Sequence, residues 1–418
     1  MSSNITAAAQ ERGIMLVKFR NIAVFNPDNL SNKTASDFEI NYIDIESVNL
    51  GVITGFKKHK FGDAPSRAKR KVQKGDILIS MVRPYLRAFG ILEDISENMV
   101  CSTGFAVLRV NPNVNPDYVF RFVMSDAFVN QLIPKMVGAN YPAVSVEDIK
   151  DCLIPLPMYE EQSIIATILG EADALIQKRK EAIAKLDELV QSVFLEMFGG
   201  GMINTEVNDY FELGKLIISG PQNGLYKPAS EYGSGFPILR IDSFYDGKVE
   251  NIESLKRVNI SSDELEKYSL NELDIVINRV NSKKYLGKSA IIPRLKEPTV
   301  FESNMMRFSV DSTLIDPEYL IYFMQQPIIK KQILSKSRDA VNQSSINQQD
   351  VLSLLVYLPY MNIQKKFVAF YRQIEQEKRY MENQLIKLEF NFQSLLHQAF
   401  TGQLHFNEGK VDEYAIER

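Results

Sequence analysis

The feature that most constrains this chain is a long helical segment that occurs twice, in register and without a gap. Pro157 and Pro359 lie 202 residues apart, and Gln162 and Gln364 keep the same separation. In each copy, apolar residues recur at alternating steps of three and four, the spacing that lets two helices share one buried stripe. Each copy therefore predicts one helix of about 40 residues, or about 60 Å at 1.5 Å per residue.

The ends of the first copy carry helix signals. Glu160 and Glu161 follow Pro157 and would lie in the first turn, where carboxylates favour the positive end of a helix. Three consecutive glycines, residues 199–201, mark the expected end, because glycine is common just beyond a helix. We expect the first long helix to stop at these glycines.

A globular segment of about 150 residues precedes each helix, and each segment alone has the size of a single domain. Strand-like runs and a helix that begins with proline occur in the same order in both segments. The expected strands are residues 42–48, 76–82 and 105–110, then 238–244 and 274–280; the helices open at Asn115-Pro116 and Asp316-Pro317. The sequence predicts an α+β protein with two tandem mixed α/β domains, each followed by a long helix.

The average charge of the chain conceals two basic clusters. The formal net charge is −4, which argues weakly against a nucleic-acid partner. Residues 57–87, however, contain ten basic and only two acidic side chains, and residues 279–294 contain five basic and no acidic ones. Solvated lysines on a surface loop would give the same pattern, but such clusters also bind the phosphates of DNA.

The two segments differ most in stretches that we expect to be loops, residues 57–71, 219–235 and 278–288. Arg, Lys, Asn and Gln side chains pair with base edges, and tyrosine stacks or contacts phosphate. The candidate DNA-binding residues are Lys57, Lys58, Lys60, Arg67, Lys69, Arg70, Lys71, Arg83, Arg87, Asn140, Tyr141, Asn223, Tyr226, Arg279, Asn281, Lys283, Lys284 and Gln343.

No stretch of the sequence carries a catalytic or cofactor-binding pattern. The runs that begin at Asn115 and Asp316 lack the second proline of the adenine-methyltransferase motif and are better explained as helix starts. Glycine-rich phosphate loops are absent, and the cysteines and histidines show no zinc-ligand spacing. The apolar run at residues 14–17 is too short for a signal peptide or a membrane span. We expect a cytoplasmic, non-catalytic protein without a bound metal.

Several stretches resemble the DNA specificity subunit of type I restriction-modification systems. One is NYPAVSVEDIKDCLIPLPMYEEQ, residues 140–162, which continues into the first long helix as residues 172–199. In the second half, the resemblance lies in LGKSAIIP, residues 286–293, and QSLLHQAFTGQL, residues 393–404. It extends over nearly the whole chain after residue 16.

The resemblance implies a subunit that makes no bonds itself. It implies two target recognition domains, each reading one half of a bipartite site in double-stranded DNA. Methyltransferase subunits would dock on the chain, with ATP-driven restriction subunits as a further candidate partner and no membrane involved. S-adenosylmethionine, ATP and magnesium are then expected only on the partner subunits.

The heptad stripes also predict how the two helices meet. The second helix starts from the second domain, so it must run back along the first if the stripes pack together. We therefore expect an antiparallel coiled coil that sets the distance between the half-sites. The expected parts are an N-terminal extension (1–16), recognition domain 1 (17–157), helix 1 (158–200), recognition domain 2 (201–359), helix 2 (360–402) and a tail (403–418).

Two other functions remain open at the level of sequence. A self-contained DNA modification or restriction enzyme would need donor-binding and catalytic motifs, which the sequence lacks. A coiled-coil scaffold without a role on DNA would leave the two basic clusters unexplained. Methyl transfer by the isolated chain would favour the first alternative. The absence of salt-sensitive binding to duplex DNA would favour the second.

Overall fold

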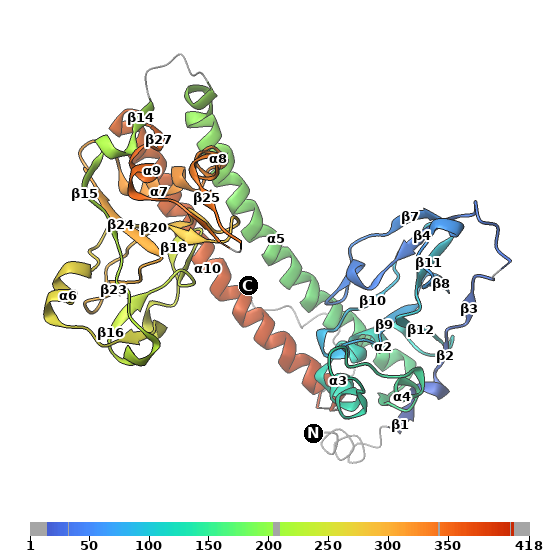
Figure 1. Cartoon of the computed structure of the whole chain (residues 1–418). Helices are drawn as coiled ribbons and strands as arrows, with labels where there is room; N and C mark the ends of the chain where they lie inside the picture. Colours follow the sequence, from blue (N-terminus) through green and yellow to red (C-terminus); the bar gives the residue numbers. More distant parts are fainter. Residues whose placement is uncertain (1–14, 32, 204–209, 342, 402, 405–418) are drawn as a thin grey trace. The chain divides into compact units, whose positions relative to one another are not determined.

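The computed structural model describes residues 15–31, 33–203, 210–341, 343–401 and 403–404. Two compact units divide the chain (Figure 1). Unit 1 comprises the residues up to Ala182 together with those from Met381, and unit 2 comprises Ile183–Tyr380. Each unit contains one mixed α/β domain and part of both long helices, which confirms the predicted fold class.

Unit 1 is built on two sheets. Its four-stranded sheet has the order β10-β9-β12-β2, and its five-stranded sheet the order β3-β8-β11-β4-β7, in which only β4 and β11 pair in parallel. The strands are β1 (Met15–Lys18), β2 (Ala23–Phe25), β3 (Asp28–Asn29), β4 (Glu39–Ile43), β5 (Val48–Asn49), β6 (Val52–Ile53), β7 (Lys57–Lys60), β8 (Ala68–Lys71), β9 (Ile77–Ser80), β10 (Phe89–Ile91), β11 (Met99–Ser102), β12 (Phe105–Val110) and β13 (Leu153–Leu156). The short helices are α2 (Pro116–Val123), α3 (Asp126–Leu132) and α4 (Val146–Lys150).

Unit 2 repeats this plan with a different periphery. A six-stranded sheet has the order β15-β24-β20-β22-β18-β17, and two three-stranded sheets have the orders β19-β16-β23 and β21-β26-β25. The strands are β14 (Tyr210–Glu212), β15 (Ile217–Asn223), β16 (Tyr232–Leu239), β17 (Phe244–Tyr245), β18 (Gly247–Val249), β19 (Arg257–Val258), β20 (Ile275–Asn278), β21 (Val280–Asn281), β22 (Ser289–Ile291), β23 (Val300–Phe301), β24 (Met305–Val310), β25 (Arg338–Asp339), β26 (Ser344–Ser345) and β27 (Leu355–Tyr357). The short helices are α6 (Ser262–Tyr268), α7 (Pro317–Met324), α8 (Pro327–Lys336) and α9 (Gln348–Leu352).

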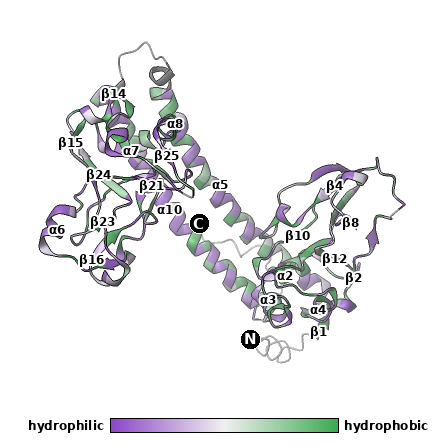
Figure 2. Ribbon diagram, viewed as in Figure 1, coloured by the Kyte–Doolittle hydropathy of each residue, from purple (hydrophilic) through white to green (hydrophobic). Residues whose placement is uncertain are grey.

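The two long helices are α5 (Tyr159–Ile203) and α10 (Met361–Phe400). In unit 1, Ile165 and Phe400 share one core, and Lys180 pairs with Glu389 at 2.8 Å. The two helices are thus antiparallel in unit 1. Both helices mix polar and apolar residues along their length (Figure 2). The residues at the predicted heptad spacing are buried or half-buried, among them Ile165, Leu169 and Ile176 in α5 and Phe367, Ile374 and Leu385 in α10.

Unit 2 holds the other parts of the same helices in the same antiparallel sense. The rings of Phe194 and Phe367 lie 5.3 Å apart, and Lys378 bonds to Asp187 at 2.6 Å. Lys378, a polar break in the apolar stripe, is therefore neutralised by a carboxylate on the other helix. The predicted antiparallel packing is confirmed within each unit.

The predicted end of the first helix was wrong. α5 continues through glycines 199–201 to Ile203. Each glycine in a helix interior costs about 1 kcal/mol relative to alanine. The cost is borne because Val190, Phe194 and Phe198 bury one face of this last part in the core of unit 2, so tertiary packing overrides the local stop signal.

Two further expectations need correction. The strand expected at residues 42–48 ends at Ile43, because the carboxylate of Asp44 accepts a hydrogen bond from the backbone of Ser47 and caps a short 3-10 turn. Residues 57–71, expected to be a loop, supply β7 and β8 of the five-stranded sheet. Lysines hide the strand signal there, and lysine is common on sheet edges because it discourages further pairing.

The second unit also departs from expectation. The strand expected at residues 238–244 divides into the end of β16 and the start of β17. The stretches 219–235 and 278–288, also expected to be loops, include parts of β15 and β16 and the short strand β21. The helix starts were correct: Asn115 and Asp316 each accept a hydrogen bond from the first turn of α2 and α7.

Candidate nucleic-acid interface

The same pair of loops is built in both units. In unit 1, the segment that we call the first tongue, residues 137–143, returns to the end of β9 through bridges from Ala143 to Val82 and Val137. In unit 2, the second tongue, residues 338–345, pairs with β21, with Ser345 opposite Val280. Each tongue therefore lies beside the segment that follows an interior strand of the main sheet, β9 in unit 1 and β20 in unit 2. This arrangement brings candidate residues of the tongue and of that segment close together.

The first tongue places three predicted residues in one cluster. The Nη2 of Arg83 donates to the carbonyl oxygen of Asn140 at 2.9 Å, and the guanidinium carbon lies 4.7 Å from the centre of the Tyr141 ring. Arg83 has a left-handed backbone with φ 48°, and Tyr141 is 70% exposed. Tyr85 is an exposed neighbour. The cluster places a guanidinium cation over the face of an accessible ring.

Arg70 and Arg87, also predicted to bind DNA, are engaged within unit 1. A guanidinium nitrogen of Arg70 bonds to the side-chain oxygen of Asn26, which also accepts from the backbone of Val107. Burial lowers the pKa of Arg70. Arg87 pairs with Asp126 at the start of α3. These two arginines therefore join loops and strands within unit 1.

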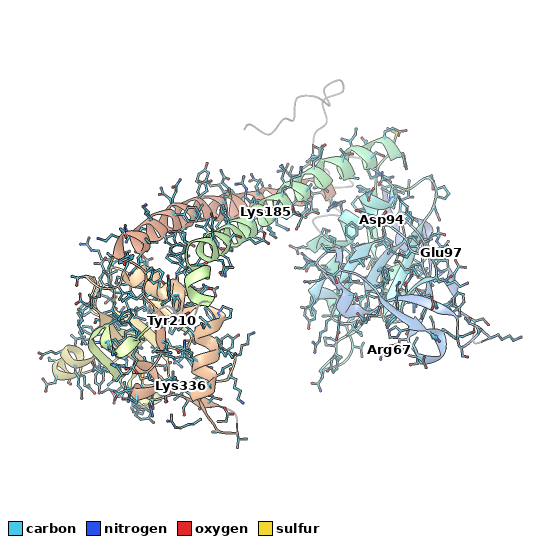
Figure 3. The ribbon with its side chains drawn as sticks, turned by 90° about the horizontal axis from the view of Figure 1, so that it is seen from above. Arg67, Asp94, Glu97, Lys185, Tyr210 and Lys336 are labelled. Atoms are coloured by element: carbon cyan, nitrogen blue, oxygen red, sulfur yellow. The ribbon has the colours of Figure 1, made fainter. Side chains whose placement is uncertain are left out.

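The other predicted cations of unit 1 follow the five-stranded sheet. Lys58 and Lys60 are exposed on β7, which is the edge strand, and Arg67 is exposed before β8 (Figure 3). Lys57 bonds to the carboxylate of Asp44 at 2.5 Å, which raises the pKa of Lys57. Lys69 and Lys71 lie on β8, half-buried and exposed respectively. The edge strand thus exposes two lysines, Lys58 and Lys60.

In unit 2 most candidate residues come from two segments, residues 223–226 and 279–284, on either side of the turn at residues 303–304. Backbone hydrogen bonds join this turn to both segments, from Ser303 to Leu225 and from Arg279 to Asn304. Asn223 and Tyr226 flank it on one side, and Tyr226 is 78% exposed. A guanidinium nitrogen of Arg279 also bonds to the Ser303 carbonyl at 3.2 Å.

The second tongue completes this surface. Lys283 pairs with Asp339 of the tongue at 2.7 Å. The Gln343 carbonyl accepts from Ala340 and closes the tip, where Val341 is 99% exposed. Asn281 lies on β21 and Lys284 on the loop that follows it. The Asn281 side chain accepts a hydrogen bond from Ser282, and the Lys284 ammonium lies 5.1 Å from the Tyr285 ring centre.

Sequence reasoning missed residues that the structure adds to these surfaces. Exposed apolar side chains, Leu86 and Val137 in unit 1 and Val341 in unit 2, sit on the loops beside the predicted polar ones. Lys288, counted only as part of a basic cluster, lies 3.8 Å from the ring centre of Tyr245 and bonds to the Ile241 carbonyl. A valine or lysine in a polar run carries no local signal for such a position.

Within the described ranges, no group of three or more His, Cys, Asp or Glu side chains could hold a metal ion. Across those same residues, no helix is sufficiently long and apolar to cross a membrane. Cys101 and Cys152 are buried and unpaired with each other, and burial raises the pKa of each thiol to about 12. Both thiols thus behave as core residues.

Comparison with known proteins identifies the chain. The family model for the type I restriction modification DNA specificity domain matches residues 23–186 and 209–389. The chain is 24% identical over 361 residues to the EcoKI specificity subunit of Escherichia coli K12, and 26% identical over 359 residues to the StySPI specificity subunit of Salmonella potsdam. Each match covers 81% of this chain and 76% of the relative.

Solved structures agree on the fold. A chain from a structure of type I restriction-modification complex assembly has a TM-score of 0.57 at 22% identity, covering 93% of this chain and 98% of that one. The S subunit from M. genitalium has a TM-score of 0.54 at 13% identity, covering 94% and 96%. These structures share the two domains and the pair of long helices with this chain. The chain belongs to the type I restriction-modification DNA specificity family, and its role is DNA-sequence specificity.

Proposed function

We propose that the two domains read the two halves of one bipartite target in double-stranded DNA. The observation that carries this proposal is the repeated loop pair, because each unit sets a polar tongue beside the loop after its central strand. Arginine reads guanine and asparagine reads adenine in the major groove. Arg83 and Asn281 follow the bridged residues Val82 and Val280 in the two units, so they hold equivalent positions.

We further propose that the chain makes and breaks no bonds and that methyltransferase subunits bind its helices. The support is apolar surface on α10: Tyr380, Ile386 and Phe390 are exposed, Phe390 to 75%. Large exposed apolar side chains of this kind mark protein interfaces when they gather on one element. S-adenosylmethionine, ATP and magnesium would then bind partner subunits, with restriction subunits as a further partner, in the cytoplasm.

A selection experiment tests the proposal. The full chain, isolated with the subunits that co-purify with it, is mixed with a library of duplexes randomised over about 25 base pairs, a span that holds two half-sites one helical turn apart. We expect enrichment of one motif with two specified halves and an unspecified spacer. The chain alone should transfer no labelled methyl groups from S-adenosylmethionine, while the complex should. Methyl transfer by the isolated chain would identify an enzyme, and absence of any enriched motif would favour a scaffold.

A further inference from the structure

The ammonium group of Lys330, on α8, is committed to the backbone of one candidate DNA-binding loop. Its Nζ donates to the carbonyl oxygens of Lys283 at 2.8 Å, Lys284 at 3.0 Å and Leu286 at 2.8 Å. A lysine ammonium has three donors and no acceptor. All three donors therefore end on one short segment of backbone, which we call the lysine-clamped loop, residues 282–288.

A second contact, between Gly287 and the side chain of Ile333, packs the same loop against α8. Gly287 has φ 75°, and a Cβ at this position would collide with the side chain of Ile333. Gly287 therefore serves two needs, because only glycine adopts this backbone readily and only glycine leaves room for Ile333. Leu286 beside it is fully buried. The helix thus holds the loop through one polar and one apolar contact.

Two side chains of the clamped loop reach solvent. Lys283 and Lys284 are both exposed, although their carbonyl oxygens face the ammonium of Lys330. Lys283 reaches Asp339 of the second tongue at 2.7 Å. Lys330 is half-buried, and this burial lowers the pKa of its ammonium group. Removal of the ammonium group would leave three carbonyl oxygens without their donor.

The first unit holds the equivalent loop in another way. Gln131 of α3 exchanges two hydrogen bonds with the backbone of Leu153, and Gln332 of α8 does the same with Leu355. The two glutamines therefore hold equivalent positions, and α3 in unit 1 corresponds to α8 in unit 2. Two residues before the glutamine, unit 1 has the buried Val129 where unit 2 has Lys330. The loop of unit 1 is tied instead by Arg87 to Asp126.

We propose that Lys330 is a positioning residue that fixes the lysine-clamped loop for reading the second half-site. The inference rests on the proposed function, since it presumes that this loop meets DNA. Lys330 itself points into the unit and acts through Lys283, Lys284 and their neighbours. Its removal should free the loop and blur the base preference of one half-site only.

The test compares K330M, K330R and K331M in the full chain with its co-purifying subunits, using the randomised duplex library. Methionine keeps most of the length of lysine without its charge, and Lys331 is an exposed lysine on the same helix. K330M should lose about tenfold in discrimination at one half-site, the equivalent of about one hydrogen bond to a charged group. K330R should regain most of this loss, because guanidinium also donates to carbonyl oxygens. K331M should match the unmodified chain.

Three results would overturn the inference: unchanged discrimination in K330M, an equal loss in K331M, or equal losses at both half-sites. Thermal unfolding of each variant separates loop release from loss of the fold. Should K330M fail to fold, K330Q replaces it, because glutamine also removes the ammonium group; unchanged discrimination in a folded K330Q contradicts a positioning role. If the unmodified chain enriches no motif at all, the proposed function itself is refuted, which is a different outcome.

Discussion

The two recognition domains share the joints that fix them to the helices and differ in the surfaces they present. Tyr118 donates to the Pro155 carbonyl at 2.7 Å, and Tyr319 donates to the Tyr357 carbonyl at 2.9 Å. A glutamine of each long helix also accepts a hydrogen bond from the backbone N–H just before a short helix: Gln162 from Asn115 before α2, and Gln364 from Asp316 before α7. The joint therefore tolerates little change, since a substitution there would leave buried polar groups without their hydrogen-bond partners.

Away from the joint, the units diverge. Unit 1 carries a five-stranded sheet whose edge is basic, with Lys58 and Lys60 exposed on β7. Unit 2 has the short sheet β19-β16-β23 in its place, with α6 beside it. The clamps differ as well, Arg87 to Asp126 in one unit and Lys330 in the other. The comparison teaches that one frame carries two different surfaces in the two units.

The largest effect should come from exchanging a whole reader. Replacing residues 17–153 with the corresponding domain of another specificity subunit should change one half of the target completely and leave the other half and the spacer intact. The reason is that the candidate loops of unit 1 all lie within this range. Sequencing of methylated sites in cells that carry the hybrid measures the outcome. A hybrid that alters both halves would show that the two readers are not independent.

Next in size should be a change in spacing. Four residues inserted into each long helix, after Ala184 in α5 and after Met381 in α10, lengthen the pair by about 6 Å. The spacer between half-sites should grow by about one or two base pairs, while both half-sites keep their sequences. The positions lie between the ion pairs Lys180–Glu389 and Asp187–Lys378. An unchanged spacer would show that the helices do not set the distance.

A smaller effect is expected from single residues at equivalent positions. R83A should relax the base preference in the first half-site by about tenfold or more, because one good bidentate pair contributes about 1–3 kcal/mol of discrimination. N281A should do the same in the second half-site alone. Competition binding with single-base variants of the selected motif measures both. The assignment fails if either variant relaxes the half-site read by the other domain.

The smallest effect should concern salt dependence rather than sequence. The triple variant K58A/K60A/R67A removes three exposed cations from unit 1 and should reduce the slope of log K against log salt by up to about 0.9 for each lost phosphate contact. The selected motif should stay the same. Binding titrations at several salt concentrations provide the measurement, with K331A as the control. An unchanged slope would place this edge away from DNA.

The sequence by itself determined the frame. The heptad periodicity and the fixed 202-residue separation of Gln162 and Gln364 predicted two long helices, and Asn115 and Asp316 marked the helix starts that the structure contains. These signals are local, because a helix repeats every few residues and a cap bonds to its own first turn. The resemblance of the chain to a known family then supplied the role on DNA.

Only the tertiary structure decided which cations are available and where the first helix ends. Arg70 bonds to Asn26 and Arg87 to Asp126, partners that are 44 and 39 residues away, and Lys330 holds carbonyl groups 44 to 47 residues before it. A cation's partner is set by the packing of elements that are distant along the chain, so charge counts cannot separate binding residues from supporting ones. Packing likewise carried α5 through its glycines, because burial of Phe194 and Phe198 outweighs a local propensity of about 1 kcal/mol per residue.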